Sequence, residues 1–355
     1  MRLTDGIPEE ALRDLAARAN AADAAAQWPA DSWQALRRTG ALRWCIPPEY
    51  GGDGLKGVPL LERYERLAAA CLTSCFILSQ RDAACRRLRD SGNGVLCQEV
   101  LPALAAGDTF ATVGLSHLTT SRQHLKPALG ARDRGDAFVL DGSIPWVTGA
   151  QQADHLVIGA ALEDGRQILT VLPRRLDGVI VGPPLDLMAL AGSITAEVQC
   201  RNVALDKKWL LAGPVERVMA GGRGSTGGLE TSCLALGLTA AATAYLHEEA
   251  RARPELRVTA ERLEHSRQLL RKEMHQSAES GASPEAVAAL RARVNSLVLR
   301  ATQAALTAAK GTGFLRDHPA QRWARQALFF LVWSCPRPAA EATLAYLTAG
   351  EAECS

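Results

Sequence analysis

The sequence predicts an α+β protein in three parts: an N-terminal helical domain, a middle domain of antiparallel strands and a C-terminal four-helix bundle. Residues up to about 107 carry apolar side chains at helical spacing. Residues 109–213 change to short alternating or β-branched runs separated by Gly, Pro and Asp. Long helical patterns return beyond them. We therefore expect domains at 1–108, 109–213 and 214–355.

The N-terminal domain is expected to begin with an alanine-rich helix over residues 11–26, opened by Pro8, Glu9 and Glu10. Asp31 and Ser32 are typical caps and are expected to start the next helix. Residues 60–89 keep apolar side chains at helical spacing throughout. The pattern of this last stretch predicts one long helix.

The C-terminal domain is expected to hold helices over residues 229–251, 254–280, 284–310 and 319–333. Pro254 and Pro284 suit the first turns of two of them. The glycine-rich residues 221–228 come before the first helix, where exposed backbone N–H groups can bind a phosphate. This segment lacks the Gly-Lys-Ser/Thr ending of a P-loop and follows no βαβ unit. We favour a flexible connection over a nucleotide-binding loop.

Composition excludes several classes of protein. The 355 residues are 47% hydrophobic, enough for a sizeable core, and 40 Lys and Arg nearly balance 38 Asp and Glu, which gives no field toward nucleic acid or an anionic membrane. Residues 1–8 lack the apolar core of a signal peptide, and no run approaches the roughly 20 apolar residues of a membrane span. The nine scattered Cys and seven His show no metal-binding spacing. We expect a cytoplasmic protein with buried, reduced thiols and no metal.

Residues 141–150, DGSIPWVTGA, have the clearest chemical character in the chain. They follow a strand-like run at 137–140, and Thr148 lies two positions after Trp146, so a strand would place both side chains on one face. The indole could then cover a flat ring while the hydroxyl bonds the edge of that ring. A hairpin strand with a core Trp and a turn at Gly149 fits this segment equally well.

Further segments follow the same order along the chain. Residues 33–40 and 46–54 form a helix, a glycine stop and a Pro-Glu-x-Gly-Gly-x-Gly loop, and strand-like runs occupy 153–158 and 169–173. Residues 309–314 and 318–327 add a glycine turn and a Pro-x-x-Arg-x-x-Arg helix. Together with residues 141–150, these segments resemble the acyl-CoA dehydrogenase family over nearly the whole chain.

The resemblance implies a barrel-like middle domain, FAD bound between that domain and the C-terminal bundle, and a homodimer or homotetramer. It assigns Trp146 to the face of the isoalloxazine and Thr148 to the region of flavin N5. The family's Glu-Pro-x-x-Gly-Ser segment corresponds to residues 116–121, where Ser116 and Ser121 supply hydroxyls for the cofactor.

Two more FAD contacts follow from the resemblance. The family's Arg-x-x-Phe-Gly loop, which reaches the FAD of a neighbouring subunit, is shortened here to residues 251–256, and Arg251 or Arg253 is its candidate anion partner. Gly311 and Gly313 correspond to the turn near the adenine end. A solvated arginine, and a helix end in which Gly takes a positive φ, explain these residues without FAD. Arg322 and Arg325 are expected to serve helix pairing or salt bridges.

The catalytic base departs from the family pattern. In most members a Glu lies seven residues after the Ala that corresponds to Ala327, and here that count reaches Ser334. Some relatives carry the base on the first helix of the bundle, which makes Glu230 the candidate, about one turn from the usual position. A Glu in a first helical turn is also favourable for the helix dipole alone. Glu341 is a weaker candidate.

The sequence therefore supports an FAD-dependent oxidoreductase acting on the CH–CH bond of an acyl thioester, carried by CoA or a carrier protein, with an electron acceptor or oxygen as the second partner. Ser334 in place of the usual base favours a flavin monooxygenase of the same fold as the alternative. The altered segment at 116–122 and the shortened loop at Arg251 motivate a third possibility, a degenerate paralogue that serves as a binding scaffold.

Overall fold

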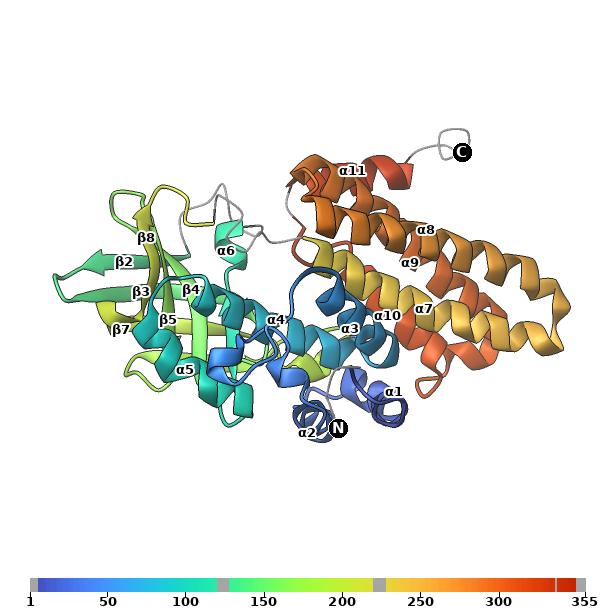
Figure 1. Cartoon of the computed structure of the whole chain (residues 1–355), viewed down its shortest axis with the longest axis horizontal. Coiled ribbons are helices and arrows are strands. Elements are labelled where there is room, and N and C mark those ends of the chain that lie inside the picture. Colours follow the sequence, from blue (N-terminus) through green and yellow to red (C-terminus); the bar gives the residue numbers. More distant parts are fainter. Residues whose placement is uncertain (1–5, 120–127, 220–227, 336, 349–355) are drawn as a thin grey trace.

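The structure, a computed structural model, describes residues 6–119, 128–219, 228–335 and 337–348. It has the three parts that the sequence predicts, with the N-terminal helices between a sheet and a helical bundle (Figure 1). Ser121 and residues 221–227 of the glycine-rich segment lie outside the described residues. Gly228 directly precedes the first bundle helix.

The N-terminal helices are α1 (Glu9–Ala24), α2 (Ala30–Arg38), α3 (Gly57–Ala70), α4 (Leu72–Arg89) and α5 (Gly94–Ala106). The expected single helix over 60–89 is two helices, because Cys71 takes an extended backbone (φ −150°, ψ 100°) between α3 and α4. The apolar spacing continues across this break, so periodicity could not locate it. Pro29, not Asp31, is the N-cap of α2, and Asp31 lies inside the first turn.

The middle part is an eight-stranded sheet with the order β6-β7-β3-β2-β4-β5-β8, and β1 pairs with β4. Its strands and the short helix that follows β1 are β1 (Ala111–Gly114), α6 (Ser116–Thr119), β2 (Leu129–Asp133), β3 (Ala137–Val147), β4 (His155–Leu162), β5 (Gln167–Pro173), β6 (Val179–Pro184), β7 (Ala196–Asp206) and β8 (Leu210–Val215). Most pairings are antiparallel as expected, but β1 and β2 both run parallel to β4. Short turns predict antiparallel hairpins between consecutive strands, whereas β1 and β2 reach β4 through longer connections.

The C-terminal bundle contains α7 (Leu229–Ala252), α8 (Arg257–Ser280), α9 (Pro284–Ala309) and α10 (Pro319–Phe329), and α11 (Arg337–Thr348) packs on α9. Pro284 starts α9 as expected, whereas Pro254 starts a short 3-10 turn before α8. Helix α10 ends four residues before its expected end at Trp333. The four expected helices are therefore present with shifted ends, and α11 is additional.

Helix α7 is long and apolar enough to cross a membrane by length and composition alone, but 67% of its apolar window is buried inside the protein. It packs against α3, α8 and α9, which accounts for its apolar character. Gly237 permits the approach to α3, since a Cβ there would lie 2.4 Å from the Glu65 carbonyl oxygen and 2.7 Å from the Ala68 Cβ.

A network of ion pairs joins α8 to α3, and we call it the α3–α8 seam. Arg267 contacts Glu65 (2.5 Å) and Glu264 (2.6 Å), while Arg271 contacts Glu62 and Glu65 at 2.8 Å each. The Glu65 side chain is only 7% exposed and lies between the two guanidinium groups. Each arginine of the seam therefore binds two carboxylates at hydrogen-bond distance.

The described cysteines are free thiols, and all of them except Cys335 are buried, as the sequence predicts. One group, Cys45, Asp82 and Cys85, brings its polar atoms within 4.8 Å of one another. Both oxygens of Asp82 already accept hydrogen bonds at 2.7 Å, one from Tyr64 and one from Arg81. The carboxylate of this group is thus satisfied by protein donors.

Candidate active site

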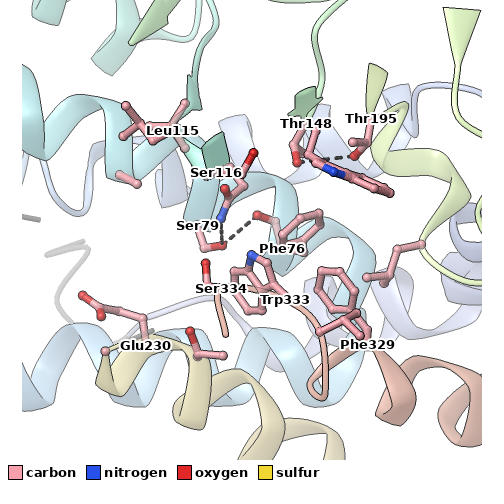
Figure 2. A pocket seen from close by; sticks show the side chains of 18 of the residues that line it. Phe76, Ser79, Leu115, Ser116, Thr148, Thr195, Glu230, Phe329, Trp333 and Ser334 are labelled. Carbon is pink, nitrogen blue, oxygen red and sulfur yellow. Dashed lines mark hydrogen bonds between the residues drawn. The ribbon is translucent and has the colours of Figure 1, made fainter. Parts of the chain in front are cut away.

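A cavity of about 1020 Å³ opens where the sheet, α4 and the N-terminal end of α7 meet (Figure 2). Its walls come from all three parts of the chain. Trp146, Thr148 and Thr195 line it from the sheet, Phe76 to Arg87 from α4, and Glu230 and Ser334 from the bundle. Its volume is at the upper end of the range usual for small-molecule and cofactor sites.

The sheet wall carries the two residues of the 141–150 segment that the sequence singled out. Trp146 is 53% exposed, and Thr148 is buried with its hydroxyl 3.4 Å from that of Thr195. The regular alternation of side chains along a strand does not explain how these two residues reach the cavity. Trp146 has φ +60°, and the pairing register of β3 with β7 shifts between Ile144 and Val147. The prediction that strand alternation puts both side chains on one face is therefore wrong, but both side chains line the same cavity.

Ser116 begins α6 and donates a hydrogen bond to the carbonyl oxygen of Pro145 at 3.1 Å, next to Trp146. It lines the cavity, and its role as a hydroxyl for the cofactor stays a prediction. Thr195 lines it too and was missed by the sequence analysis. It follows Ile194, whose positive φ of 39° turns the chain into β7, and no sequence signal marks that turn.

Three cavity-lining residues other than glycine have left-handed backbones: Trp146 (φ 60°), Leu190 (φ 60°) and Ser334 (φ 42°). A bulky side chain at positive φ is unfavourable and persists only where the surrounding structure enforces it. Such residues concentrate at functional sites. The left-handed backbone conformations therefore occur at the same cavity that the predicted cofactor side chains line.

Helix α4 forms one wall with residues spaced three and four apart, which places them on one helical face: Phe76, Ser79, Gln80, Ala83, Arg86 and Arg87. This face changes in character along its length. Phe76 packs edge-on against Phe329 and Trp333, with ring centroids 5.0 Å away in each case. The opposite end of the face carries Arg86 and Arg87. No motif that carries the family resemblance lies on α4, so the sequence does not mark this helix as part of a site.

Glu230 lies in the first turn of α7 and lines this cavity together with Trp146 and Thr148. Figure 2 shows Glu230 at one end and Thr148 and Thr195 at the other, with Ser79 and Ser334 between them. Its Oε1 is 3.6 Å from the Arg86 Nη2. The Glu230 side chain is 39% exposed, so the carboxylate is open to the cavity and not sealed in the core.

Among the described residues, Asp90 is the other carboxylate that lines the cavity. Arg89 binds both of its oxygens, at 2.6 and 2.9 Å. Glu341, the weaker candidate base, pairs with Arg337 at 2.6 Å on α11, outside the cavity lining. Glu230 is therefore the less engaged of the two cavity carboxylates.

Arg87 is 9% exposed, and burial lowers the pKa of its guanidinium to about 10, with the positive charge of Arg86 acting in the same direction. Glu230 and Asp90 oppose this shift. Additional negative charge at this end of the cavity would therefore stabilise the protonated guanidinium of Arg87.

The backbone of Ser334 is hydrogen-bonded to a buried arginine. Arg291 donates to the carbonyl oxygens of Ser334, Trp333 and Phe330, and Asn295 donates to Phe330 O at 3.1 Å. Burial lowers the pKa of Arg291. These bonds fix the turn after α10 and present Trp333 and Ser334 to the cavity.

The other described residues predicted to contact FAD lie away from this cavity. Arg251 is 78% exposed and pairs with Glu248 at 2.8 Å near the C-terminal end of α7, about 30 Å along the helix from Glu230. Gly311 and Gly313 belong to a 3-10 turn, Lys310–Phe314, that follows α9. Neither takes the expected positive φ, which falls on Lys310 (53°).

Gly313 serves a close approach instead, since a Cβ there would lie 2.6 Å from the Ala309 Cβ. The expected pairing of Arg322 and Arg325 is confirmed. Arg325 binds Asp23 at 2.8 Å, and Arg322 donates to Asn20.

Comparison with known proteins agrees with this architecture. The family model described as acyl-CoA dehydrogenase, N-terminal domain, matches residues 3–108. The probable acyl-CoA dehydrogenase YngJ of Bacillus subtilis is 25% identical over 248 residues. Residues 3–108 therefore belong to the N-terminal domain of the acyl-CoA dehydrogenase family. The alignment with YngJ covers 66% of this chain and 64% of that protein, slightly less than two thirds of its length.

Solved acyl-CoA dehydrogenase folds superpose on nearly the entire chain. The butyryl-CoA dehydrogenase from Megasphaera elsdenii has a TM-score of 0.82 at 17% identity and covers 96% of this chain and 97% of its own. A glutaryl-CoA dehydrogenase from Mycobacterium smegmatis in complex with FADH2 has a TM-score of 0.78 at 18% identity, with coverages of 96% and 95%. These similarities establish the acyl-CoA dehydrogenase fold for this chain.

Proposed function

We propose that this member of the acyl-CoA dehydrogenase family is an FAD-dependent oxidoreductase that removes hydrogen from the α and β carbons of an acyl thioester. The observation that supports the proposal is the shared cavity. Trp146, Thr148 and Ser116 line it from the sheet, and the Glu230 carboxylate lines it from the bundle. A flavin site and a proton acceptor therefore face one space.

The sheet wall fits a flavin. Trp146 is 53% exposed into a cavity that an aromatic ring system would cover, and burying that indole against a ring is favourable. The hydroxyls of Thr148, Thr195 and Ser116 offer hydrogen bonds to ring nitrogens and carbonyls. When bound, FAD supplies the acceptor for the hydride that leaves the β-carbon.

The remaining cofactor residues are proposed for a site shared between subunits. Arg251, Gly311 and Gly313 lie outside the cavity of their own chain, so contact with FAD requires a neighbouring copy. Ser121 is proposed to add a hydroxyl on the segment after Ser116. Exposed apolar side chains on the bundle support a homodimer or homotetramer: Phe314 (82%), Leu344 (61%) and Leu315 (57%).

Glu230 is proposed to accept the α-proton. A base must come within hydrogen-bond reach of the proton it removes, and Glu230 opens to the cavity without a hydrogen bond at normal length to Arg86. The ring stack of Phe329 on Trp333, at 5.2 Å and 12°, forms an apolar surface in the same cavity that excludes water from the thioester.

The partners follow from this chemistry. The substrate is an acyl group on CoA or on a carrier protein, and the reduced flavin passes electrons to a protein acceptor or to oxygen. We propose that the enzyme works in the cytoplasm.

The test is an absorption spectrum of the purified protein, followed by anaerobic mixing with a panel of acyl thioesters. A flavin spectrum that bleaches on mixing supports the dehydrogenase. A flavin that resists every thioester but consumes oxygen when reduced and supplied with substrate indicates the monooxygenase. A colourless protein that FAD cannot reconstitute indicates the scaffold.

A further inference from the structure

The end of the cavity where α4 meets α7 is charged, and this is unusual for a pocket that would hold an alkyl chain. Arg86 and Arg87 line it from α4, and Glu230 lines it from α7. Ser79 and Gln80 continue the polar surface toward the middle of the cavity. An alkyl group placed there would desolvate these charged groups without replacing their lost hydrogen bonds.

Arg86 has unused capacity for an anion. Its two contacts at this end are long, 3.6 Å to the Glu230 carboxylate and 3.4 Å to the Tyr64 hydroxyl. A guanidinium has five N–H donors and can hold two carboxylates at once. Arg267 and Arg271 of the α3–α8 seam do so in this same chain, with contacts of 2.5 to 2.8 Å.

We infer that the acyl group of the substrate carries a carboxylate, which Arg86 binds at the α4–α7 end of the cavity. The inference rests on the proposed function, because it treats this cavity as the acyl site. The adjacent positive charge of Arg87 favours the same anion. Since Arg86 lies beside Glu230, the bound carboxylate is close to the carbon that loses its proton, and the acyl chain is short.

The experiment compares two thioesters of equal chain length, succinyl-pantetheine and butyryl-pantetheine, which differ in a terminal carboxylate. Pantetheine is the arm that CoA and carrier proteins share, and it lacks their phosphates. Dissociation constants are measured anaerobically by calorimetry on the FAD-loaded full-length protein, and flavin bleaching is recorded separately. The variants are Arg86→Met, Arg86→Lys and the control Arg66→Met, which removes an arginine paired with Glu9 outside the cavity.

We expect the wild type and Arg66→Met to bind the succinyl ester at least about tenfold tighter than the butyryl ester, the effect of one hydrogen bond to a charged group. Arg86→Met abolishes the preference, and Arg86→Lys keeps part of it, which separates lost recognition from lost folding. Equal binding of the two esters by the wild type overturns the inference, as does a preference that survives in Arg86→Met.

A third result also overturns it. The CoA esters of both acids are titrated in parallel. If Arg86→Met weakens the binding of both CoA esters but of neither pantetheine ester, the guanidinium binds a phosphate and not the acyl carboxylate. The proposed function fails separately. A preference for the succinyl ester without flavin bleaching contradicts the dehydrogenase but supports the carboxylate site. Flavin bleaching by both esters with equal affinity supports the dehydrogenase but contradicts the carboxylate site.

Discussion

Arginine–glutamate pairs join the N-terminal helices to the bundle at two places, and the two places differ in how completely the charges are used. In the α3–α8 seam, Glu65 is 7% exposed and its contacts to Arg267 and Arg271 measure 2.5 and 2.8 Å. At the α4–α7 end of the cavity, Glu230 is 39% exposed and lies 3.6 Å from Arg86. In the seam, which we call closed, the buried carboxylate and the guanidinium groups bind one another at hydrogen-bond distance. At the cavity, the carboxylate and the guanidinium keep hydrogen-bonding capacity for a ligand.

The difference separates ion pairs that stabilise this fold from an ion pair that is available to a ligand. Closed pairs stabilise, because every buried donor and acceptor has its partner. An open pair next to a cavity contributes little stability, since long and partly exposed ion pairs are weak. It does keep a carboxylate and a guanidinium available to a ligand. The predictions below change one member of this comparison at a time.

The largest expected effect is that of Glu230→Gln on chemistry. If Glu230 is the base, the rate of thioester-dependent flavin reduction falls by about 10²–10⁴-fold, the usual contribution of a positioned base. FAD content and thioester binding stay near wild type. Stopped-flow absorbance under anaerobic conditions measures the rate. Glu62→Gln, a partly exposed carboxylate of the seam, is the matched control and should leave the rate unchanged.

An unchanged rate in Glu230→Gln would assign this residue to the first helical turn alone. The reaction would then need another proton acceptor, and the monooxygenase would become the better interpretation.

Glu65→Gln should give the largest loss of stability. It removes the buried charge that two arginines share, although Arg267 keeps Glu264 and Arg271 keeps Glu62. We expect a loss of about 2–4 kcal/mol in the free energy of unfolding, between the value of one charged hydrogen bond and that of a broken buried pair. Urea denaturation measures it. A loss below roughly 0.5 kcal/mol, the range usual for surface substitutions, would contradict a closed seam.

Gly237→Ala tests the contact that holds α7 against α3. The new Cβ would lie 2.4 Å from a backbone oxygen of Glu65, so the helices must separate. Overpacking of this kind costs about 1–3 kcal/mol, against roughly 1 kcal/mol gained from the helix propensity of alanine. Gly94→Ala in α5, where nothing lies within 4 Å of the new Cβ, is the control and should be neutral or stabilising. Thermal unfolding of both variants compares them.

The sequence predicted the residues that a short motif defines and missed those that only tertiary contact defines. Trp146, Thr148, Ser116 and Glu230 were placed from local segments, and all four line the cavity. Thr195 reaches it through a turn with positive φ, and no sequence signal marks that turn.

The charged wall was missed for a related reason. Arg86 lies on a helix whose apolar spacing predicts only packing, and its role depends on the N-terminal end of α7, which is far away in the sequence. The break at Cys71 was invisible because apolar residues keep helical spacing on both sides of it. Periodicity reports which face is buried, but it does not report where the chain turns or what the face meets.

The smallest predicted effect is a pH dependence of the seam. Burial would raise the pKa of Glu264, but hydrogen bonds from Arg267 and Gln268 outweigh it and lower the pKa below the ordinary value of 4.5. A carboxyl with a lowered folded-state pKa contributes stability above its unfolded pKa and loses it as the pH falls. The free energy of unfolding should therefore decline from pH 4.5 downward. Glu264→Gln should flatten that decline in a series of urea denaturations. An equally steep decline in the variant would show that other carboxylates cause it and that the seam is not closed at Glu264.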